Sequence, residues 1–227
     1  MITVACVCWG DKFTDNYVQN LQAMVKRNTT VEHEFICLSD RDIEGVKTKR
    51  LMKGYQGWWN KLQLFHAGFG FQDRVVYLDL DTLIVNNIDW LLEYEGVFMG
   101  IEDLGCANAH QPHLKNVLQS GVMAWDYSMH HKVWEAFKMN PDAVKKFRGD
   151  GEFLQSLIPP YARDLLQKRY PNKLKSYKYQ VYNEGVDKEL SIVCFHGRPS
   201  VEQAMEEVIH TPMATYAPQG WIKDYWR

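Results

Sequence analysis

The run RVVYLDLDTLIV, residues Arg74–Val85, carries the strongest signal of fold and chemistry in this sequence. It is apolar and β-branched like a buried strand, except that Asp79 and Asp81 interrupt it. Two buried carboxylates are costly unless a cation meets them, because isolated buried charge is expensive and like charges repel. Alternation along an extended segment would place both side chains on one side, where they could share a divalent cation. The alternative is that the aspartates only cap backbone groups at a strand end.

Strand and helix patterns alternate on both sides of this run. Five apolar residues spaced three or four apart follow Thr14, and they predict a helix near the start of the chain. Together these patterns predict one α/β domain over residues 1–227, with a mixed, mostly parallel sheet flanked by helices. The expected strands cover residues 2–8, 34–40, 74–85, 96–103, 120–126 and 190–197, and the further expected helices cover residues 58–69, 127–139, 149–158 and 199–209.

The composition is that of an ordinary folded protein. Of the 227 residues, 46% are hydrophobic and 24% are charged. The formal net charge of −2 removes the strong positive field that nucleic-acid binders normally use. The five cysteines are odd in number and no apolar run is long enough to span a membrane, which favours reduced thiols in a cytoplasmic protein without a transmembrane segment. Cys6 and Cys8 are too close together for a zinc knuckle.

A second polar group follows another expected strand. His196 comes directly after the apolar SIVCF, and Gly197, Arg198 and Pro199 follow it. Two carboxylates and one imidazole, with positions left open for phosphate oxygens, suit manganese or magnesium, and the imidazole favours manganese. We therefore predict that Asp79, Asp81 and His196 converge on one metal ion. A lone histidine with a purely structural role is the alternative.

In its motifs and their order, the chain resembles the GT-A-fold glycosyltransferases, and most closely the glycogenin-related family 8 enzymes and their small bacterial and phage relatives. The similarity spans nearly the whole chain. It is densest over residues 58–93, which carry a Lys-Leu helix, the Asp-x-Asp strand and an N-x-x-Asp helix start in that order. The other matching pieces are the Trp9-Gly10 loop, LSD at residues 38–40, SGVMAWD at 120–126, GDGEFLQ at 149–155 and FHGRP at 195–199.

The resemblance implies a metal-dependent transferase. It would move a sugar from a nucleotide-diphosphate donor, expected to be a UDP-sugar, to an unidentified hydroxyl acceptor (a saccharide, a protein or modified DNA), with retention of configuration. Mn²⁺ or Mg²⁺ would be held by Asp79, Asp81 and His196. The implied catalytic residues are Asp150, Asp79 and Lys61. The implied donor-binding residues are Cys8, Trp9, Tyr17, Asp40, Lys61, Leu80, Ser120, Gly121, Gly197 and Arg198.

Three positions depart from the pattern of that family. Gln119 stands where Asn is usual, Arg198 where Lys is usual, and Gly151 where a Gln normally lies near the reacting sugar. Glu152 is a candidate substitute for that Gln, although a glutamate favoured by the helix dipole at a helix start is the plainer explanation.

Other functions fit parts of the sequence. Phosphatases of the haloacid dehalogenase type also use Asp-x-Asp, but they need Asp-x-Asp-x-Thr near the chain start, and Thr82 is one position early. A non-catalytic module that binds nucleotide sugars or carbohydrates is a second alternative, which Gly151 favours. The third alternative is the same sugar transfer with hydroxymethylated bases of phage DNA as the acceptor. Acceptor contacts are expected from the loop Cys106–Gln119 and the end of the chain, GWIKDYWR.

Overall fold

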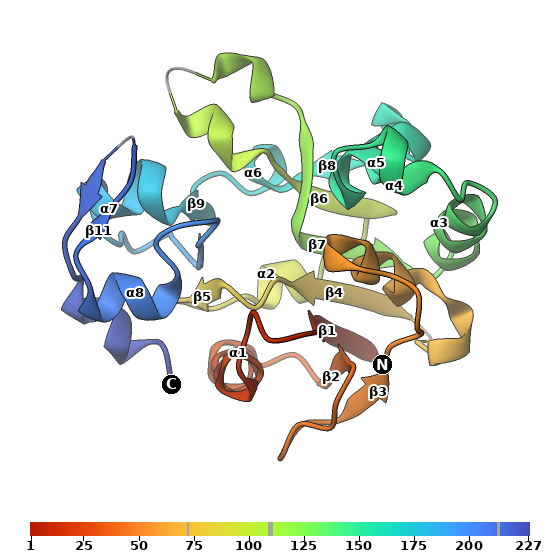
Figure 1. Cartoon of the computed structure of the whole chain (residues 1–227), viewed down its shortest axis with the longest axis horizontal. Coiled ribbons are helices and arrows are strands. Elements are labelled where there is room, and N and C mark those ends of the chain that lie inside the picture. The colour runs from red at the N-terminus through yellow and green to blue at the C-terminus, as the bar shows by residue number, and fades with distance from the viewer. Residues whose placement is uncertain (72, 109–110, 213) are drawn as a thin grey trace.

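A computed structural model describes residues 1–71, 73–108, 111–212 and 214–227. Within these residues the largest sheet has seven strands in the order β3-β2-β1-β4-β7-β6-β8 (Figure 1). β7 is antiparallel to β4 and β6, and the other neighbouring strands are parallel. The predicted α/β fold with a mixed, mostly parallel sheet is confirmed. The seven strands are β1 (Ile2–Cys8), β2 (His33–Ser39), β3 (Thr48–Arg50), β4 (Arg74–Leu78), β6 (Phe98–Glu102), β7 (Leu118–Asp126) and β8 (Asp164–Leu165).

Both faces of this sheet are covered. In β1, Val4 and Cys6 belong to one hydrophobic core and Ala5 and Val7 to the other, because successive side chains of a strand point to opposite faces. Helix α1 (Asp15–Asn28) covers the first face with the five predicted apolar residues, and α3 (Met129–Lys138) and α5 (Asp150–Leu157) lie on the other side of the sheet (Figure 1). The remaining α-helices are α2 (Asp89–Leu92), α4 (Ala143–Lys146), α6 (Leu166–Arg169), α7 (Tyr182–Glu184) and α8 (Val201–Glu206).

The run Arg74–Val85 is divided between two sheets. Its first half is β4, in the middle of the large sheet, and its second half is β5 (Thr82–Ile84), which pairs with β10 (Ile192–Cys194) in a small sheet that also contains β9 (Leu174–Ser176). Between them the chain turns, and the Thr82 amide donates to the carbonyl oxygen of Asp79 over 3.1 Å. The expectation that Asp79 and Asp81 lie on one extended strand is therefore wrong. The chain leaves one sheet and enters another here, and a turn replaces the strand alternation.

The segment before β4 is helical, as predicted, but it forms a 3₁₀-helix, η1 (Gly57–Phe65). Trp59, Leu62 and Phe65 are buried at intervals of three residues, the period at which side chains align on a 3₁₀-helix. Trp58 and Lys61 are related by the same spacing and face a different environment, the cavity described below. The other short helical turns are η2 (Ala67–Phe69), η3 (Leu104–Ala107), η4 (Pro112–Leu114), η5 (Pro160–Ala162), the π-helical η6 (Tyr177–Val181) and η7 (Gly220–Asp224).

The C-terminal residues pack against the domain. Trp226 is 8% exposed and its ring meets the Tyr17 ring edge-on, with centroids 4.9 Å apart. Arg27 of α1 donates to the carbonyl oxygens of Tyr225 and Arg227. The expected acceptor loop, Cys106–Gln119, contains η3 and η4, whereas its residues 109 and 110 lie outside the described residues. Strands β11 (Ile209–His210) and β12 (Thr215–Tyr216) form a two-stranded sheet, and none of the described helices is long and apolar enough to cross a membrane.

Helix α5 approaches β7 unusually closely at Gly151. A Cβ atom there would lie 2.9 Å from the carbonyl oxygen of Leu118 and 3.3 Å from the Cα of Gln119. Both are backbone atoms that cannot rotate away. Gly151 therefore sets the depth at which the first turn of α5, which carries Asp150, rests on the sheet.

Replacing Gly151 by alanine is expected to lower the free energy of unfolding by roughly 1–3 kcal/mol, because the added methyl group must displace backbone. Urea denaturation measures the loss. Gly220→Ala is the matched control, since a Cβ at Gly220 meets nothing within 4 Å. Equal stability of the Gly151→Ala variant and the original protein would show that α5 can move without cost.

Candidate active site

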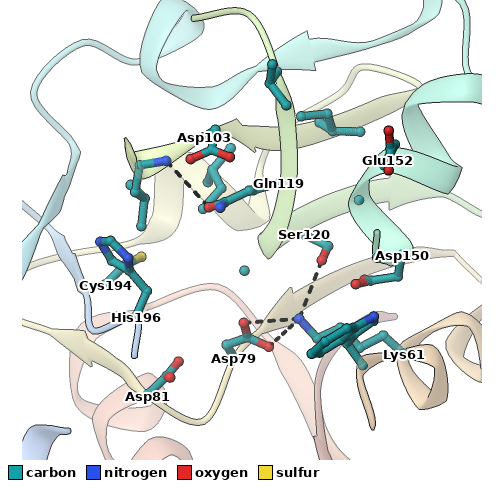
Figure 2. Close-up of a pocket in the computed structure, with 18 of the residues that line it drawn as sticks. Lys61, Asp79, Asp81, Asp103, Gln119, Ser120, Asp150, Glu152, Cys194 and His196 are labelled. Atoms are coloured by element: carbon teal, nitrogen blue, oxygen red, sulfur yellow. Dashed lines mark hydrogen bonds and ion pairs between the residues drawn. The ribbon is translucent and has the colours of Figure 1, made fainter. Parts of the chain in front are cut away.

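A cavity of about 400 Å³ lies where β4, β7 and β10 meet η1 and the start of α5 (Figure 2). It has the size of a small-molecule site. The predicted site residues that line it are Lys61, Asp79, Asp81, Ser120, Gly121, Asp150, His196 and Gly197.

Lys61 and Asp79 form the centre of a buried polar network. The Lys61 ammonium lies 2.8 Å from Asp79 Oδ1 and donates to Ser120 Oγ over 3.4 Å. The hydroxyl of Tyr77, in β4, donates to the same carboxylate oxygen of Asp79, which directly follows the strand. Burial alone would lower the pKa of Lys61, but Asp79 and Asp150 raise it above its ordinary value. The ammonium therefore stays charged at neutral pH. Strand alternation could have identified Tyr77 from the sequence.

Asp150 brings a second carboxyl group to this network from the first turn of α5. It is 4% exposed, and its Oδ2 atom has no hydrogen-bond partner among the described residues. Burial raises its pKa, although the charge of Lys61 and a hydrogen bond with Ser120 act in the opposite direction. Since buried polar atoms are nearly always paired, this oxygen has unused hydrogen-bonding capacity on a residue that lines the cavity.

Asp81 and His196 lie together at the other side of the cavity. The Phe195 amide donates to the Asp81 carbonyl oxygen over 3.0 Å, which joins the turn after β4 to the end of β10. Burial and the nearby Asp79 raise the pKa of Asp81 to about 7. His196 Nε2 is 2.8 Å from Ser176 Oγ, and burial lowers the pKa of the imidazole to about 3, so it is neutral at neutral pH. Figure 2 shows His196 and Asp81 on one side, with Asp150 and Glu152 on the other.

A further cation, which sequence reasoning missed, stands beside His196. Lys178, in η6, donates to the His196 carbonyl oxygen over 2.7 Å. A Cβ on the neighbouring Gly197 would lie 3.6 Å from its ammonium nitrogen. Arg198, which was predicted to supply this charge, is exposed and is absent from the residues that line the cavity. No feature of the linear sequence connects Lys178 with residue 196.

The cavity wall is acidic, which fits a divalent cation. The opposing cations in the lining are Lys61 and Arg148 only. Excess carboxylate oxygen at one site is the preferred environment of Mg²⁺ and Mn²⁺. In the described parts of the chain, however, no three His, Cys, Asp or Glu side chains are already arranged to hold a metal, so binding by all three predicted ligands requires side-chain rearrangement. The carboxylates of the lining are Asp79, Asp81, Asp103, Asp150 and Glu152.

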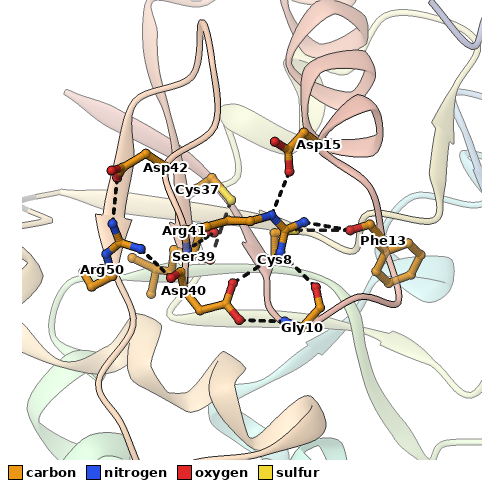
Figure 3. Close-up of polar contacts among 11 residues, drawn as sticks. Cys8, Gly10, Phe13, Asp15, Cys37, Ser39, Asp40, Arg41, Asp42 and Arg50 are labelled. Carbon is orange, nitrogen blue, oxygen red and sulfur yellow. Dashed lines mark hydrogen bonds and ion pairs between the residues drawn. The ribbon is translucent and has the colours of Figure 1, made fainter.

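The predicted nucleotide-binding residues Trp9 and Asp40 directly follow β1 and β2, respectively. Figure 3 shows the polar contacts of Asp40 in this loop cluster. Asp40 Oδ2 accepts from the Gly10 amide over 2.7 Å, so this carboxylate caps the turn after β1. Arg41 joins the cluster: its guanidinium donates to Asp15 over 2.8 Å, to the Gly10 carbonyl over 2.8 Å and to the Phe13 carbonyl over 2.9 Å. Arg41 was not predicted, and it fixes the loop that follows β1.

Other predicted donor-binding residues are accounted for by packing. Tyr17, Leu80 and Cys8 are 4%, 2% and 0% exposed, and all three belong to one hydrophobic core. Trp9 is 38% exposed. Contact of these four residues with a nucleotide stays a prediction.

No protein-family model matches the sequence, and no curated protein matches it significantly. Solved structures do match, at low identity. Galactosyltransferase LgtC, solved in complex with donor and acceptor sugar analogs, is 12% identical with a TM-score of 0.61, and the match covers 88% of each chain. Glycosyltransferase GlyE of Streptococcus pneumoniae is 14% identical with a TM-score of 0.63, over 88% of this chain and 55% of that one. The bifunctional glycosyltransferase WbbM is 9% identical with a TM-score of 0.62, over 88% and 46%.

These likenesses show that the chain has the GT-A fold of glycosyltransferases. The predicted resemblance to GT-A-fold proteins is confirmed. Assignment to family 8 stays a prediction.

Proposed function

We propose that this chain is a metal-dependent glycosyltransferase, which transfers a sugar from a UDP-sugar to a hydroxyl acceptor with retention. The observation that carries the proposal is the buried Lys61–Asp79 pair with Ser120 and Asp150, set in a GT-A fold beside Asp81 and His196. Folds of this kind host many functions, so the argument depends on the site. Retention rests on the family resemblance alone.

In this proposal, the end of the cavity near His196 receives the diphosphate. Asp79, Asp81 and His196 would hold Mn²⁺ or Mg²⁺, with the acidic wall as the supporting observation. When bound, the ion would supply positive charge to the oxygens of the leaving diphosphate. Lys61 contributes positive charge from the cavity wall, and Lys178, which is bound to the His196 carbonyl oxygen, contributes it from outside the lining. The neutral imidazole of His196 keeps a lone pair available as a ligand.

Lys61 also positions the groups around the reacting sugar. Its contacts with Asp79 and Ser120 fix both side chains, and its charge favours the ionised form of Asp150. The unpaired Oδ2 of Asp150 would accept a hydrogen bond from a hydroxyl of the acceptor. A buried oxygen that is satisfied only by substrate gives orientation as well as affinity.

A thermal-shift screen of nucleotide sugars with and without Mn²⁺ tests the proposal. We expect one UDP-sugar to stabilise the protein only when metal is present, and we expect Asp81→Ala to remove the shift. Slow Mn²⁺-dependent release of free sugar from that donor would support a transferase. No shift with any donor would refute the proposal.

Gly151 gives one competing function a specific basis. Helix α5 is too close to β7 for a side chain at this position, so the site lacks a group that the related enzymes carry near the sugar. A non-catalytic nucleotide-sugar-binding module follows from that loss. It predicts tight, metal-dependent donor binding without any release of free sugar.

We further propose that residues 1–227 act as one domain in the cytoplasm. The large and small sheets both contribute residues to the cavity, which supports a single unit. The five cysteines are free and four of them are buried, which supports a reducing compartment.

A further inference from the structure

Trp58 is an exposed tryptophan on the wall of the cavity. It is 54% exposed, whereas its neighbour Trp59 is 8% exposed and stacks on Phe137 in the core. Tryptophan buries more apolar surface than any other side chain, so leaving more than half of it in water forgoes stabilisation. The structure therefore holds Trp58 at the cavity with more than half of its surface exposed.

The indole of Trp58 is supported from one direction. A Cβ at Gly149 would lie 3.4 Å from Trp58 Nε1 and 3.7 Å from its Cδ1. The indole thus lies against the backbone just before α5, where the absence of a side chain leaves room for it. A ring held in this way is a preorganised surface, and it loses little conformational freedom when a ligand stacks on it.

Hydrogen-bonding groups line the same cavity as this ring. Arg148 and Glu152 line the cavity with Trp58, and the Arg148 amide donates to Glu152 Oε2 over 2.7 Å. The unpaired Oδ2 of Asp150 belongs to the same wall and is almost completely buried. Carboxylate oxygens accept hydrogen bonds from hydroxyl groups. An apolar ring beside such acceptors matches a sugar, which has an apolar C–H face and hydroxyls around its edge.

We propose that Trp58 is the stacking platform for a neutral sugar ring of the acceptor, with its hydroxyls directed to Asp150 and Glu152. This inference rests on the proposed transferase function and specifies its acceptor as a saccharide. Asp150 and Glu152 lie on the side of the cavity away from Asp81 and His196, where the diphosphate is placed (Figure 2). The reacting carbon of the donor sugar would then lie between the diphosphate end of the cavity and the acceptor end at Trp58.

The charges near Trp58 favour a saccharide over DNA. In the part of the chain that the structure describes, five carboxylates line the same cavity as Trp58, against two cations, Lys61 and Arg148; the carboxylates are Asp79, Asp81, Asp103, Asp150 and Glu152. The whole chain carries a net charge of −2. A polyanionic acceptor would meet repulsion at this wall, whereas DNA-binding surfaces gain affinity from lysine and arginine. A neutral glycoside carries no such penalty.

The test uses methyl β-D-glucopyranoside and methyl β-D-galactopyranoside as probes. Saturation-transfer NMR on the full chain with diamagnetic Mg²⁺ and UDP reports their binding, and steady-state transfer from the donor found in the screen reports their KM. We expect Trp58→Ala to remove the NMR signal and to raise acceptor KM at least about tenfold, with less than about a threefold change in donor KM. Trp58→Phe should give an NMR signal and an acceptor KM between those of the original protein and Trp58→Ala.

Tyr161→Ala is the matched control, because Tyr161 is 92% exposed and is absent from the residues lining the cavity. It should behave like the original protein in both assays. Glycoside binding that is absent from the original protein or unchanged in Trp58→Ala would overturn the inference, as would transfer to hydroxymethylated duplex DNA but to neither glycoside. Failure of the proposed transferase function is a different outcome: in that case no nucleotide sugar is bound or turned over. The NMR measurement still decides the sugar platform in that event.

Discussion

Asp81→Asn is expected to lower the kcat/KM of Mn²⁺-stimulated donor turnover by at least about 10³-fold, the scale of loss when electrostatic stabilisation of a leaving group is removed. Asparagine keeps the size of the side chain and removes its charge. Turnover of the donor, followed as released sugar over a Mn²⁺ titration, measures the effect. Asp142→Asn, on the exposed surface, is the control.

The same substitution is expected to stabilise the metal-free protein at neutral and alkaline pH. The pKa of Asp81 in the folded chain, about 7, lies above its ordinary value of 3.8, because burial and Asp79 disfavour the charged form. Ionisation of Asp81 therefore opposes folding: this cost is absent below pH 3.8, grows as pH rises towards 7, and is complete above it. At pH 8 the melting temperature of Asp81→Asn should exceed that of the original protein by roughly 4 °C or more, and the difference should vanish near pH 4.

Lower donor turnover combined with higher stability in Asp81→Asn would distinguish a metal ligand from a residue that only supports the fold. A residue that only supports the fold would lower both activity and stability when it is replaced. Full activity of Asp81→Asn, or a lower melting temperature at pH 8, would contradict the assignment of Asp81 to the metal site.

Lys61→Met is expected to lower the free energy of unfolding by about 3–5 kcal/mol, the usual result of removing one partner of a buried ion pair. The Lys61 side chain is 13% exposed and faces the carboxylates of Asp79 and Asp150. Without the Lys61 ammonium, the carboxyl groups of Asp79 and Asp150 remain in a poorly solvated part of the cavity wall. Chemical denaturation at pH 8 measures the loss, with the exposed Lys53→Met as control.

A second substitution makes this prediction specific. Adding Asp79→Asn to Lys61→Met removes one of the stranded charges, so the double variant should be more stable than Lys61→Met alone, although it should be inactive. Stability that falls further in the double variant would show that Lys61 contributes through packing instead of charge.

Much of the fold follows from local patterns that burial enforces. The alternating strands and helices, the apolar face of α1 and the covered sheet were all predicted, because an element that must bury its surface shows the period of that element in its sequence. The 3₁₀ form of η1 was not predicted. A 3₁₀-helix buries every third residue and an α-helix buries every third or fourth, and the two patterns look alike in a short segment.

The structure brings together only some of the predicted site residues. Asp79, Asp81 and His196 were predicted because they interrupt or directly follow apolar runs. All three line one cavity. Residues chosen as stacking partners, such as Tyr17, are buried in the core, because an aromatic residue at a helical interval serves packing and binding equally well in a sequence. Lys178 and Arg41 were missed, since each acts on a segment distant in the chain, residue 196 and residue 10 respectively.

The sequence by itself determined the α/β architecture with a covered, mostly parallel sheet and the location of the acidic site at strand ends, because apolar periodicity and the cost of burying charge are local properties of the chain. Only the tertiary structure decided that Asp79 and Asp81 occupy a turn between two sheets, that Gly151 brings Asp150 against β7, and that Trp58 faces the cavity while Trp59 faces the core. These features depend on how separate elements pack against one another, and a packing distance between distant residues leaves no trace in the spacing of either segment.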